Sequence, residues 1–448
     1  METPICDFVK AYTERDPLRL HMPGHKGMGF LGAEAMDITE IEGADVLYRA
    51  EGIIKRSEEN AATLFGTART LYSAEGSSLA IRAMLFLTAL YGRAKGRRPL
   101  VAAGRNAHKV FVTAAALLDM ELDWLFPGES GSILSCQITG EMLEEYLSAA
   151  EEKPLAVYVT SPDYLGNVAD IAALSRVCRR HEVLLLVDNA HGAYLHFLPE
   201  SRHPIALGAD LCCDSAHKTL PVLTGGAYLH VSRSAPALFS AQAENAMSLF
   251  ASTSPSYLIL QSLDMANRYL AEGYRERLQG FAGKVSALKS RLAAAGYTLV
   301  GTEPLKLTIE AKPFGYTGRE LAERLAAQNM VCEFSDPDYT VMMLTPECGE
   351  NALARIGEVL LALDRKPPIP ERMPPMTRPV KKLSPREALF SSCREESTHA
   401  CPGKVLASPT VSCPPAVPIV VCGERIDEAA IRLLDYYGIE SCCVTEKE

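Results

Sequence analysis

Short, uniformly apolar runs alternate with helical patterns through the first half of this chain. The runs "PLVAAG" (99–104), "PLAVYV" (154–159) and "VLLLVD" (183–188) are apolar on both faces of an extended strand. Strands of this kind occur in parallel sheets that helices cover on both sides. The sequence therefore predicts an α/β fold with a mostly parallel sheet. In such sheets, ligands bind beyond the carboxyl ends of the strands.

Polar groups follow four of the predicted strands, and these positions are where the chemistry is expected. The four groups are Gly76 to Ser78, Arg105 to His108, Asp188 to His191, and Ser215 to Lys218.

The pattern changes near residue 262, where a long helix is predicted to bridge two domains. Three predicted strands between 305 and 346 are typical of a smaller α+β domain, and a proline-rich stretch beginning at Pro367 indicates a stiff linker. We predict an N-terminal segment (1–30), a large domain (31–262), a small α+β domain (263–366), and a linker with a C-terminal domain (367–448).

Composition excludes several classes of function. The net charge of −10 argues against a nucleic-acid partner, because phosphate binding needs clustered Lys and Arg. The sequence has no signal-peptide pattern at its start and no membrane-length apolar run, so we expect a cytoplasmic protein that does not bind membranes. The thirteen cysteines are expected to be mostly reduced thiols. Six of them and His399 lie late in the chain, but their spacing matches no zinc pattern, so no metal is predicted.

Lys218 stands between a Ser-Ala-His run and a short apolar stretch with two glycines. Lysine is seldom fully buried without a partner. A desolvated lysine loses basicity and becomes a nucleophilic amine, as Schiff-base chemistry requires. The alternative is an ordinary surface lysine in a loop.

Asp188 ends a buried strand, where a carboxylate needs a cation or a hydrogen-bond donor. A protonated pyridine nitrogen would satisfy it, and such a pair at about 4 Å is worth roughly 4 kcal/mol at an effective dielectric of 20. A structural aspartate that caps a neighbouring loop is the alternative.

Gly76, Ser77 and Ser78 lie between a predicted strand and a helix, where backbone N–H groups and hydroxyls suit a phosphate. Ser is also an ordinary helix cap, so these residues indicate a phosphate site only together with other motifs. A Schiff-base lysine, an acid for a ring nitrogen and a phosphate cup together describe a pyridoxal 5'-phosphate (PLP) site.

Seven segments in order resemble the fold-type I, PLP-dependent Orn/Lys/Arg decarboxylases. They are "LHMPGHKGMGF" (20–30), "RNAHK" (105–109), "TSPDYLGNVADI" (160–171), "VDNAHGA" (187–193), "SAHKTLPVLTGGAYLH" (215–230), "STSPSYLILQSLDMA" (252–266) and "CPPAVPIVVCGERI" (413–426). The resemblance implies the decarboxylation of a basic amino acid (lysine, arginine or ornithine) and covers nearly the whole chain.

The resemblance also implies a role for each matching residue. Lys218 would form the Schiff base, Asp188 would bind the ring nitrogen, and His108 would stack on one ring face with Ala190 on the other. The residues that would hold the phosphate, alongside Gly76, are Ser77, Ser78, Ser215, His217 and, from the neighbouring subunit, Ser252. Either His217 or Lys218 would protonate Cα, and the sequence does not choose between them.

Three positions depart from the family pattern. Asn189 replaces a glutamate, Ala416 replaces a glycine, and Ser408 stands where relatives often carry a glutamate. With that carboxylate missing, Glu424 and Asp427 remain to bind the distal cation of the substrate, and we expect a relaxed or unusual substrate choice.

Two other functions fit the same residues: another PLP reaction, such as aminotransfer or aldol cleavage, or a catalytically silent assembly protein that keeps PLP for folding. The motif near His21 begins too early in the chain for the N-terminal wing domain of larger relatives. We therefore expect a short form that assembles as a homodimer or a dimer of dimers, with Ser252 facing the site of the partner.

Overall fold

The computed structural model describes residues 1–126, 132–409 and 417–446. Contacts within the chain group these residues into two units. Unit 1 comprises 1–96 and 171–278, and unit 2 comprises 97–170 and 279–448. No helix among the described residues is long and apolar enough to cross a membrane. The twelve cysteines in the described ranges are all free thiols.

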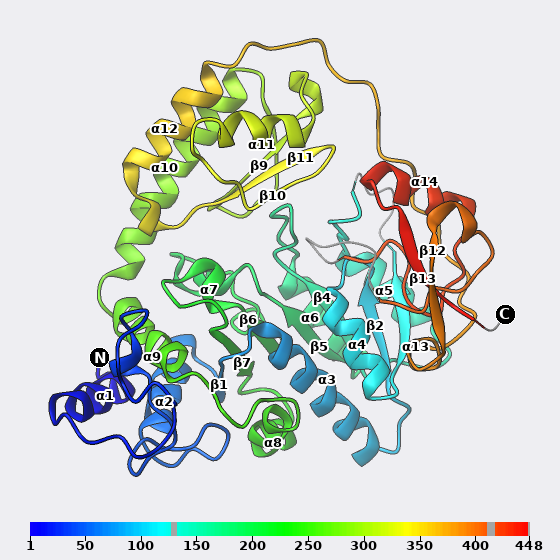
Figure 1. Cartoon of the computed structure of the whole chain (residues 1–448). Helices are drawn as coiled ribbons and strands as arrows, with labels where there is room; N and C mark the ends of the chain where they lie inside the picture. The colour runs from blue at the N-terminus through cyan, green and yellow to red at the C-terminus, as the bar shows by residue number, and fades with distance from the viewer. Residues whose placement is uncertain (127–131, 410–416, 447–448) are drawn as a thin grey trace. The chain divides into compact units, whose positions relative to one another are not determined.

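Unit 1 contains four strands in the order β1-β7-β6-β5 (Figure 1). β5 and β6 are parallel, whereas β7 runs antiparallel to both of its neighbours. Helices α2, α3 and α8 pack against β1, and α6 packs against β5. The elements of unit 1 are α1 (Pro4–Glu14), η1 (Glu34–Met36), α2 (Ile53–Phe65), β1 (Arg69–Ser73), α3 (Ser77–Ala94), α6 (Ile171–Arg180), β5 (Leu184–Asp188), η2 (Ala193–Phe197), β6 (Leu211–Asp214), α7 (Ala216–Thr219), β7 (Ala227–Val231), α8 (Ala237–Ser248) and α9 (Tyr257–Ala271).

Unit 2 contains three further strands of the parallel type, in the order β4-β2-β3, and two antiparallel sheets. The antiparallel sheets have the orders β10-β11-β9-β8 and β12-β13. Its elements are β2 (Leu100–Gly104), α4 (Lys109–Leu117), β3 (Glu121–Leu125), α5 (Gly140–Ala149), β4 (Ala156–Thr160), α10 (Tyr274–Ala294, which begins in unit 1), β8 (Thr298–Val300), β9 (Lys306–Glu310), η3 (Lys312–Phe314), α11 (Gly318–Ala326), β10 (Phe334–Ser335), β11 (Tyr339–Met343), η4 (Pro346–Cys348), α12 (Gly349–Leu361), α13 (Pro385–Leu389), β12 (Cys393–Ser397), η5 (Thr398–Ala400), α14 (Glu428–Tyr437) and β13 (Ser441–Thr445).

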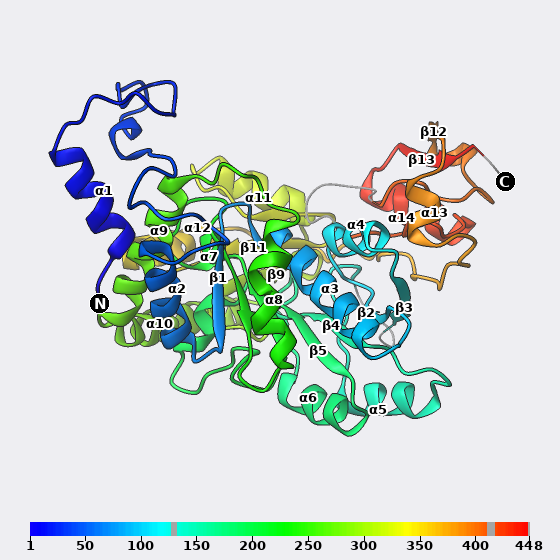
Figure 2. The same cartoon turned by 90° about the horizontal axis from the view of Figure 1, so that it is seen from below.

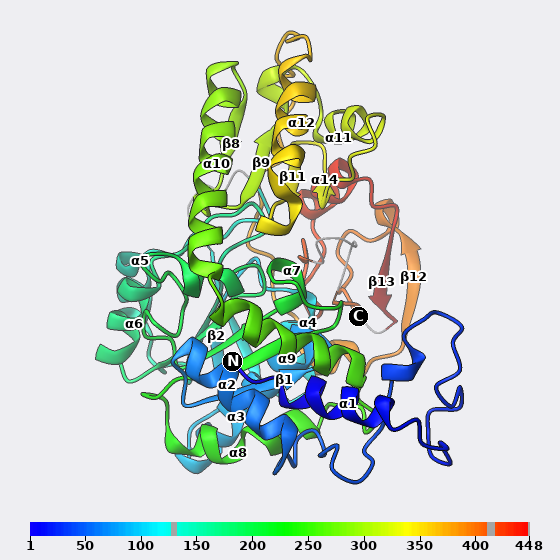
Figure 3. The same cartoon turned by 90° about the vertical axis from the view of Figure 1, so that its left-hand side faces the viewer.

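The strands expected at 99–104, 154–159 and 183–188 are confirmed as β2, β4 and β5, and all three are almost wholly buried. The single long helix predicted from 262 was wrong in one respect. Two helices, α9 and α10, occupy this segment, because Gly273 between them adopts a positive φ of 72° that a continuing helix does not allow. In Figure 3, α10 and α12 stand side by side, and Gly357 of α12 faces Leu288 of α10.

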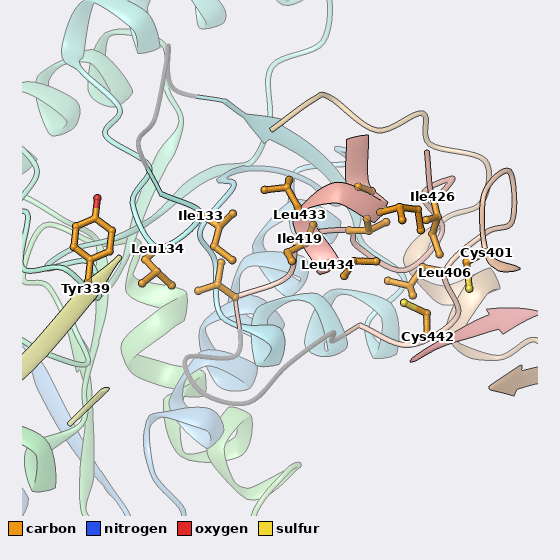
Figure 4. Close-up of a cluster of buried hydrophobic side chains, with 14 of the residues drawn as sticks. Ile133, Leu134, Tyr339, Cys401, Leu406, Ile419, Ile426, Leu433, Leu434 and Cys442 are labelled. Atoms are coloured by element: carbon orange, nitrogen blue, oxygen red, sulfur yellow. The ribbon is translucent and has the colours of Figure 1, made fainter. Parts of the chain in front are cut away.

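The C-terminal residues contribute most of a hydrophobic cluster within unit 2. Leu433 and Leu434 of α14 pack with Ile419, Ile426 and other buried side chains, as Figure 4 shows. This cluster also contains Leu134, so the C-terminal module is anchored to the loop that precedes α5. The segment that follows the proline-rich linker therefore folds as part of unit 2 and not as a loose tail.

Candidate active site

Two neighbouring strands of unit 1 end where the predicted site residues lie. Asp188 is the last residue of β5, and Ser215 comes directly after β6. The two strands are parallel, and Asp188 pairs with Cys213 in their register. Their carboxyl ends therefore coincide, as the sequence predicts for a ligand site in a sheet of this type.

The start of α3 forms a cup that suits a phosphate. Gly76 has a φ of 71°, and no side chain caps the helix that follows it. Ser77 and Ser78 are the first residues of this 18-residue helix, and Ser215 Oγ donates a hydrogen bond to Ser77 Oγ at 2.8 Å. Uncapped N–H groups at a helix N-terminus attract an anion, and two hydroxyls beside them add donors. The residues present therefore fit a phosphate group.

Glycines 225 and 226 let the chain after Lys218 return close to this cup. Gly225 has a φ of 100°, its carbonyl accepts a hydrogen bond from Gly76 N at 2.7 Å, and a Cβ there would lie 2.9 Å from Ala74 O. A Cβ on Gly226 would lie 2.3 Å from Val222 Cγ1. Side chains at these positions would push the Lys218 loop away from the start of α3.

Lys218 is half-buried in the short helix α7, which begins directly after Ser215. Its Nζ lies 3.0 Å from Nε2 of His191. The sequence placed His191 only at the end of a polar run and gave it no role. The contact adds His191 to the candidate site residues, and its position in the run Asp188 to His191 was the available signal.

Asp188 is buried, and the contacts of its carboxylate suit it to bind a protonated nitrogen. Its Oδ1 accepts a hydrogen bond from Ala190 N at 3.1 Å, and Cys213 Sγ lies 3.6 Å from the same oxygen. A thiol is a weak donor. A carboxylate held in this way at the end of a buried strand can accept a stronger hydrogen bond from a protonated ring nitrogen.

His217 is oriented by its own loop. Its backbone N–H donates to Gly226 O at 3.1 Å, and its ring Nδ1 lies 3.0 Å from the same oxygen. Because a carbonyl oxygen only accepts hydrogen bonds, Nδ1 carries the hydrogen, and Nε2 is the second ring nitrogen. The loop from Ser215 to Lys218 thus presents a hydroxyl, an imidazole and an amine within four residues.

Ser252 is exposed and lies close to the phosphate cup of its own chain. Its backbone N–H donates to Glu75 Oε1 at 2.7 Å, and Glu75 immediately precedes Gly76. The expectation that Ser252 reaches the phosphate of a neighbouring subunit stays a prediction.

His108 belongs to unit 2 and caps α4. Its Nδ1 accepts a hydrogen bond from Val110 N at 3.2 Å, so the ring orientation is fixed and its hydrogen is on Nε2. Its predicted role, stacking on the cofactor ring, stays a prediction.

Arg105, three residues before His108, forms a buried ion pair with Glu424. Its two terminal nitrogens lie 2.8 and 2.7 Å from the Glu424 carboxylate, and Glu424 also accepts from Val421 N. The Arg105 and Glu424 side chains are only 2% and 6% exposed. The guanidinium also lies over the Trp124 ring at 5.0 Å. This pair ties the C-terminal module to the loop that carries His108.

The structure argues against Glu424 as a residue that binds the distal cation of the substrate, whereas for Asp427 this role stays a prediction. Glu424 is neutralised by Arg105, and Asp427 caps α14 by accepting from Ala430 N at 2.8 Å. The Glu424 carboxylate therefore serves the fold. Ser408 is half-buried in the same module, and Ala416 lies outside the described residues.

Replacing Glu424 with Gln is expected to destabilise the protein by about 3–5 kcal/mol, because it leaves the buried Arg105 charge without its partner. The matched control is Glu350→Gln, which breaks the exposed pair between Lys284 and Glu350 and should cost less than about 1 kcal/mol. Urea unfolding measures both values. Equal, small losses would mean that water reaches Arg105 and that the pair does not hold the module.

Comparison with known proteins adds the family to this geometry. The family model described as Orn/Lys/Arg decarboxylase, major domain, matches residues 3–296, more than half of the chain. The arginine decarboxylase of Bacillus subtilis is 29% identical over 97% of this chain and 93% of its own length. The arginine decarboxylase of Halalkalibacterium halodurans is also 29% identical, over the same shares of the two chains.

Solved structures show the same fold. The lysine decarboxylase of Francisella novicida superposes with a TM-score of 0.80 at 17% identity, covering 99% of this chain and 81% of its own. The serine palmitoyltransferase of Sphingomonas wittichii superposes with a TM-score of 0.56 at 16% identity, covering 79% and 82%. These neighbours are fold-type I enzymes that use PLP, so the predicted α/β fold class is confirmed. The chain belongs to the Orn/Lys/Arg decarboxylase family and is a PLP-dependent decarboxylase.

Proposed function

We propose that the protein decarboxylates L-arginine to agmatine and CO2. The observation that carries this choice is the similarity to arginine decarboxylases along nearly the whole length of both chains. The likeness to lysine decarboxylases is a likeness of fold, and it does not choose a substrate.

The residues of unit 1 support a separate role for each side chain around the cofactor. PLP supplies an electron sink for the bond that breaks at Cα. In our proposal Lys218 binds the aldehyde carbon, Asp188 keeps the ring nitrogen protonated, and the Ser77–Ser215 pair holds the phosphate. One loop, from Ser215 to Lys218, thereby binds the cofactor at two places.

We propose that the amine of Lys218 returns the proton to Cα, with His191 as its exchange partner. The 3.0 Å contact between Lys218 Nζ and His191 Nε2 supports this role. His217 is the other candidate acid, but its Nδ1 is engaged with Gly226 O, so only Nε2 would face the reaction. His191→Gln keeps a polar side chain without a titratable ring. If Lys218 is the acid, this variant should change the pH profile of kcat. If His217 is the acid, the profile should stay as in the wild type.

The substrate assignment is tested by measuring kcat/KM for arginine, lysine and ornithine on the purified holoenzyme, with the amine products identified by mass spectrometry. We expect arginine to give the highest kcat/KM and agmatine to be its product. A higher value for lysine or ornithine would refute the choice of arginine while leaving the decarboxylase intact. A keto acid from any of the three would point to aminotransfer.

We also propose that the protein is a homodimer or a dimer of dimers. The segment after α1 loops away from α2 and α9 (Figure 2) and carries exposed apolar side chains. Leu18 and Leu20 are both 84% exposed, Phe30 is 82% exposed and Leu31 is 95% exposed. A run of exposed apolar residues of this kind is typical of a surface that a partner covers.

Light scattering of the holoenzyme is expected to give at least twice the mass of one chain. Leu20→Ser combined with Phe30→Ser should shift the equilibrium toward monomer and lower activity, because apolar area at the contact is lost. Val331→Ser, at a residue that is 93% exposed in unit 2, is the control and should change neither. An active monomer or a decamer would contradict the proposal.

A further inference from the structure

A buried carboxylate that takes no part in the proposed reaction lies directly beside the cofactor residues. Asp214 ends β6 and has no exposed surface. Its Oδ2 lies 3.0 Å from Nε2 of His203 and 3.1 Å from Nε2 of His230, two rings that are also fully buried. Its Oδ1 accepts a hydrogen bond from Asn189 Nδ2 at 2.7 Å. Asn189, His203 and His230 thus surround one carboxylate, and Cys212 Sγ lies 3.6 Å from its Oδ1.

The hydrogen positions in this network follow from its outer contacts. Ile205 N donates to Nδ1 of His203, so this ring carries its hydrogen on Nε2 and donates it to Asp214. His230 Nδ1 lies 2.9 Å from Thr70 Oγ1, a hydroxyl that can donate to it. Burial alone would raise the pKa of Asp214, but the two imidazoles outweigh it and hold that pKa below its usual value. Asp214 is therefore an anion that accepts from Asn189 and the two imidazoles, with the weakly donating Cys212 thiol 3.6 Å from its Oδ1.

The same three residues are also a possible metal group, because one ligand atom from each lies within 4.8 Å of the others. Hydrogen bonds account for these contacts without an ion. The His203 Nε2 that would bind a metal carries the hydrogen donated to Asp214, and a metal ligand must be deprotonated at that atom. We therefore favour the network, and metal binding becomes an outcome of the test.

The network joins the two strand ends that hold the proposed cofactor contacts. Asn189 follows Asp188, and Ser215 follows Asp214. Register pairing of β5 with β6 ends at Asp188 and Cys213, after which Asn189 N donates to Cys213 O. The bond between Asn189 and Asp214 is the side-chain link that extends this pairing by one more residue.

We propose that Asp214 is a positioning residue that fixes the distance between Asp188 and the Ser215–Lys218 loop. This distance determines how well the two segments can bind the cofactor at both of its ends. The inference rests on the proposed roles of Asp188 and Lys218 but not on which amino acid is the substrate. It requires one carboxylate and one amide at positions 189 and 214, because two carboxylates at the 2.7 Å separation of this pair repel each other.

An exchange of the two side chains tests this requirement. Asn189→Asp places a second carboxylate against Asp214, whereas the double variant Asn189→Asp with Asp214→Asn restores one carboxylate and one amide. In the double variant, the amide nitrogen introduced at position 214 can donate to the carboxylate at position 189, while the amide oxygen accepts from His203 and His230. The hydrogen bonds that join positions 189, 203, 214 and 230 are thereby retained with the charge moved to the other strand, and only the weak contact of the Cys212 thiol with Oδ1 is lost.

The measurements are the Kd for PLP from titration of the apoprotein, the apparent pKa of the visible cofactor absorbance, and the Tm of the apoprotein. We expect Asn189→Asp to weaken PLP binding by about 10- to 100-fold, as loss of a supporting hydrogen-bond partner does at bound cofactors and metals, and to shift the absorbance pKa. The double variant should return to within about threefold of the wild type. A double variant as impaired as the single one, or a single variant that binds PLP normally, would overturn the proposal.

A second pair keeps the test decisive if Asn189→Asp does not fold. His203→Gln retains an N–H donor toward Asp214 and should keep both the PLP Kd and the absorbance pKa, whereas His203→Leu removes the donor and should alter both. Equal behaviour of the two variants would overturn the proposal. One equivalent of zinc that the wild type retains after dialysis against a chelator, and that His203→Gln loses, would show a metal site instead. None of these readouts depends on the substrate, so a wrong substrate assignment would leave them unchanged.

Discussion

Lys218→Ala is expected to remove the visible absorbance of the PLP-loaded protein and to lower kcat by at least about 10³-fold, because the proposed covalent link to the cofactor is lost. The fold should survive, because Lys218 is only half-buried. It lies in a four-residue helix whose backbone hydrogen bonds do not depend on the lysine side chain. Absorbance spectroscopy and turnover of arginine measure the two effects. PLP should still bind through its phosphate, with weaker affinity.

Lys55→Ala is the matched control, because Lys55 is an exposed lysine of the same unit. It should keep both the absorbance and the turnover of the wild type. A Lys218→Ala protein that keeps the visible absorbance would show that another lysine carries the cofactor.

Asp188→Ala is expected to separate cofactor binding from catalysis. The variant leaves the Ser77–Ser215 pair intact, which we propose holds the phosphate, so PLP affinity should fall by less than about tenfold. The proposed charge partner of the ring nitrogen is lost, and an interaction worth about 4 kcal/mol corresponds to a loss of about 10³-fold in kcat.

Asp188→Glu keeps the charge and should recover part of this loss, whereas Glu59→Gln, at an exposed position of α2, should have no effect. The Kd for PLP and single-turnover rates measure the two parts independently. Near-normal turnover of Asp188→Ala would mean that another residue binds the ring nitrogen.

The sequence predicted the part of the site that depends on strand ends. Asp188 and Ser215 follow uniformly apolar strands, and parallel strands place their carboxyl ends together, so their proximity needed no long-range information. Ser77 was predicted beside them because a glycine and two serines open a long helix there. Chain-local patterns were sufficient in each case.

The contacts that the sequence did not predict join residues far apart in the chain. Arg105 and Glu424 are separated by 319 residues, and no periodicity reports that their side chains meet. Glu424 looked available to a substrate because its partner could not be read from the sequence. His191 was visible as a polar residue, but its contact with Lys218 depends on the turn that follows β5.

The Asp214 network was missed for a related reason. His203 and His230 stand in segments that read as an ordinary loop and an ordinary strand, and only tertiary packing brings both rings to one carboxylate. Asn189 departs from the family pattern, and its hydrogen bond to Asp214 explains why an amide is suited to this position.

The central claim, decarboxylation of arginine with PLP, is tested most directly by following arginine labelled with ¹³C at its carboxyl carbon on the holoenzyme. We predict labelled CO2 and unlabelled agmatine in equal amounts, with the cofactor still in its aldehyde form. Lys218→Ala should give no product. Formation of a keto acid with the label retained, or no product from any basic amino acid, would contradict it.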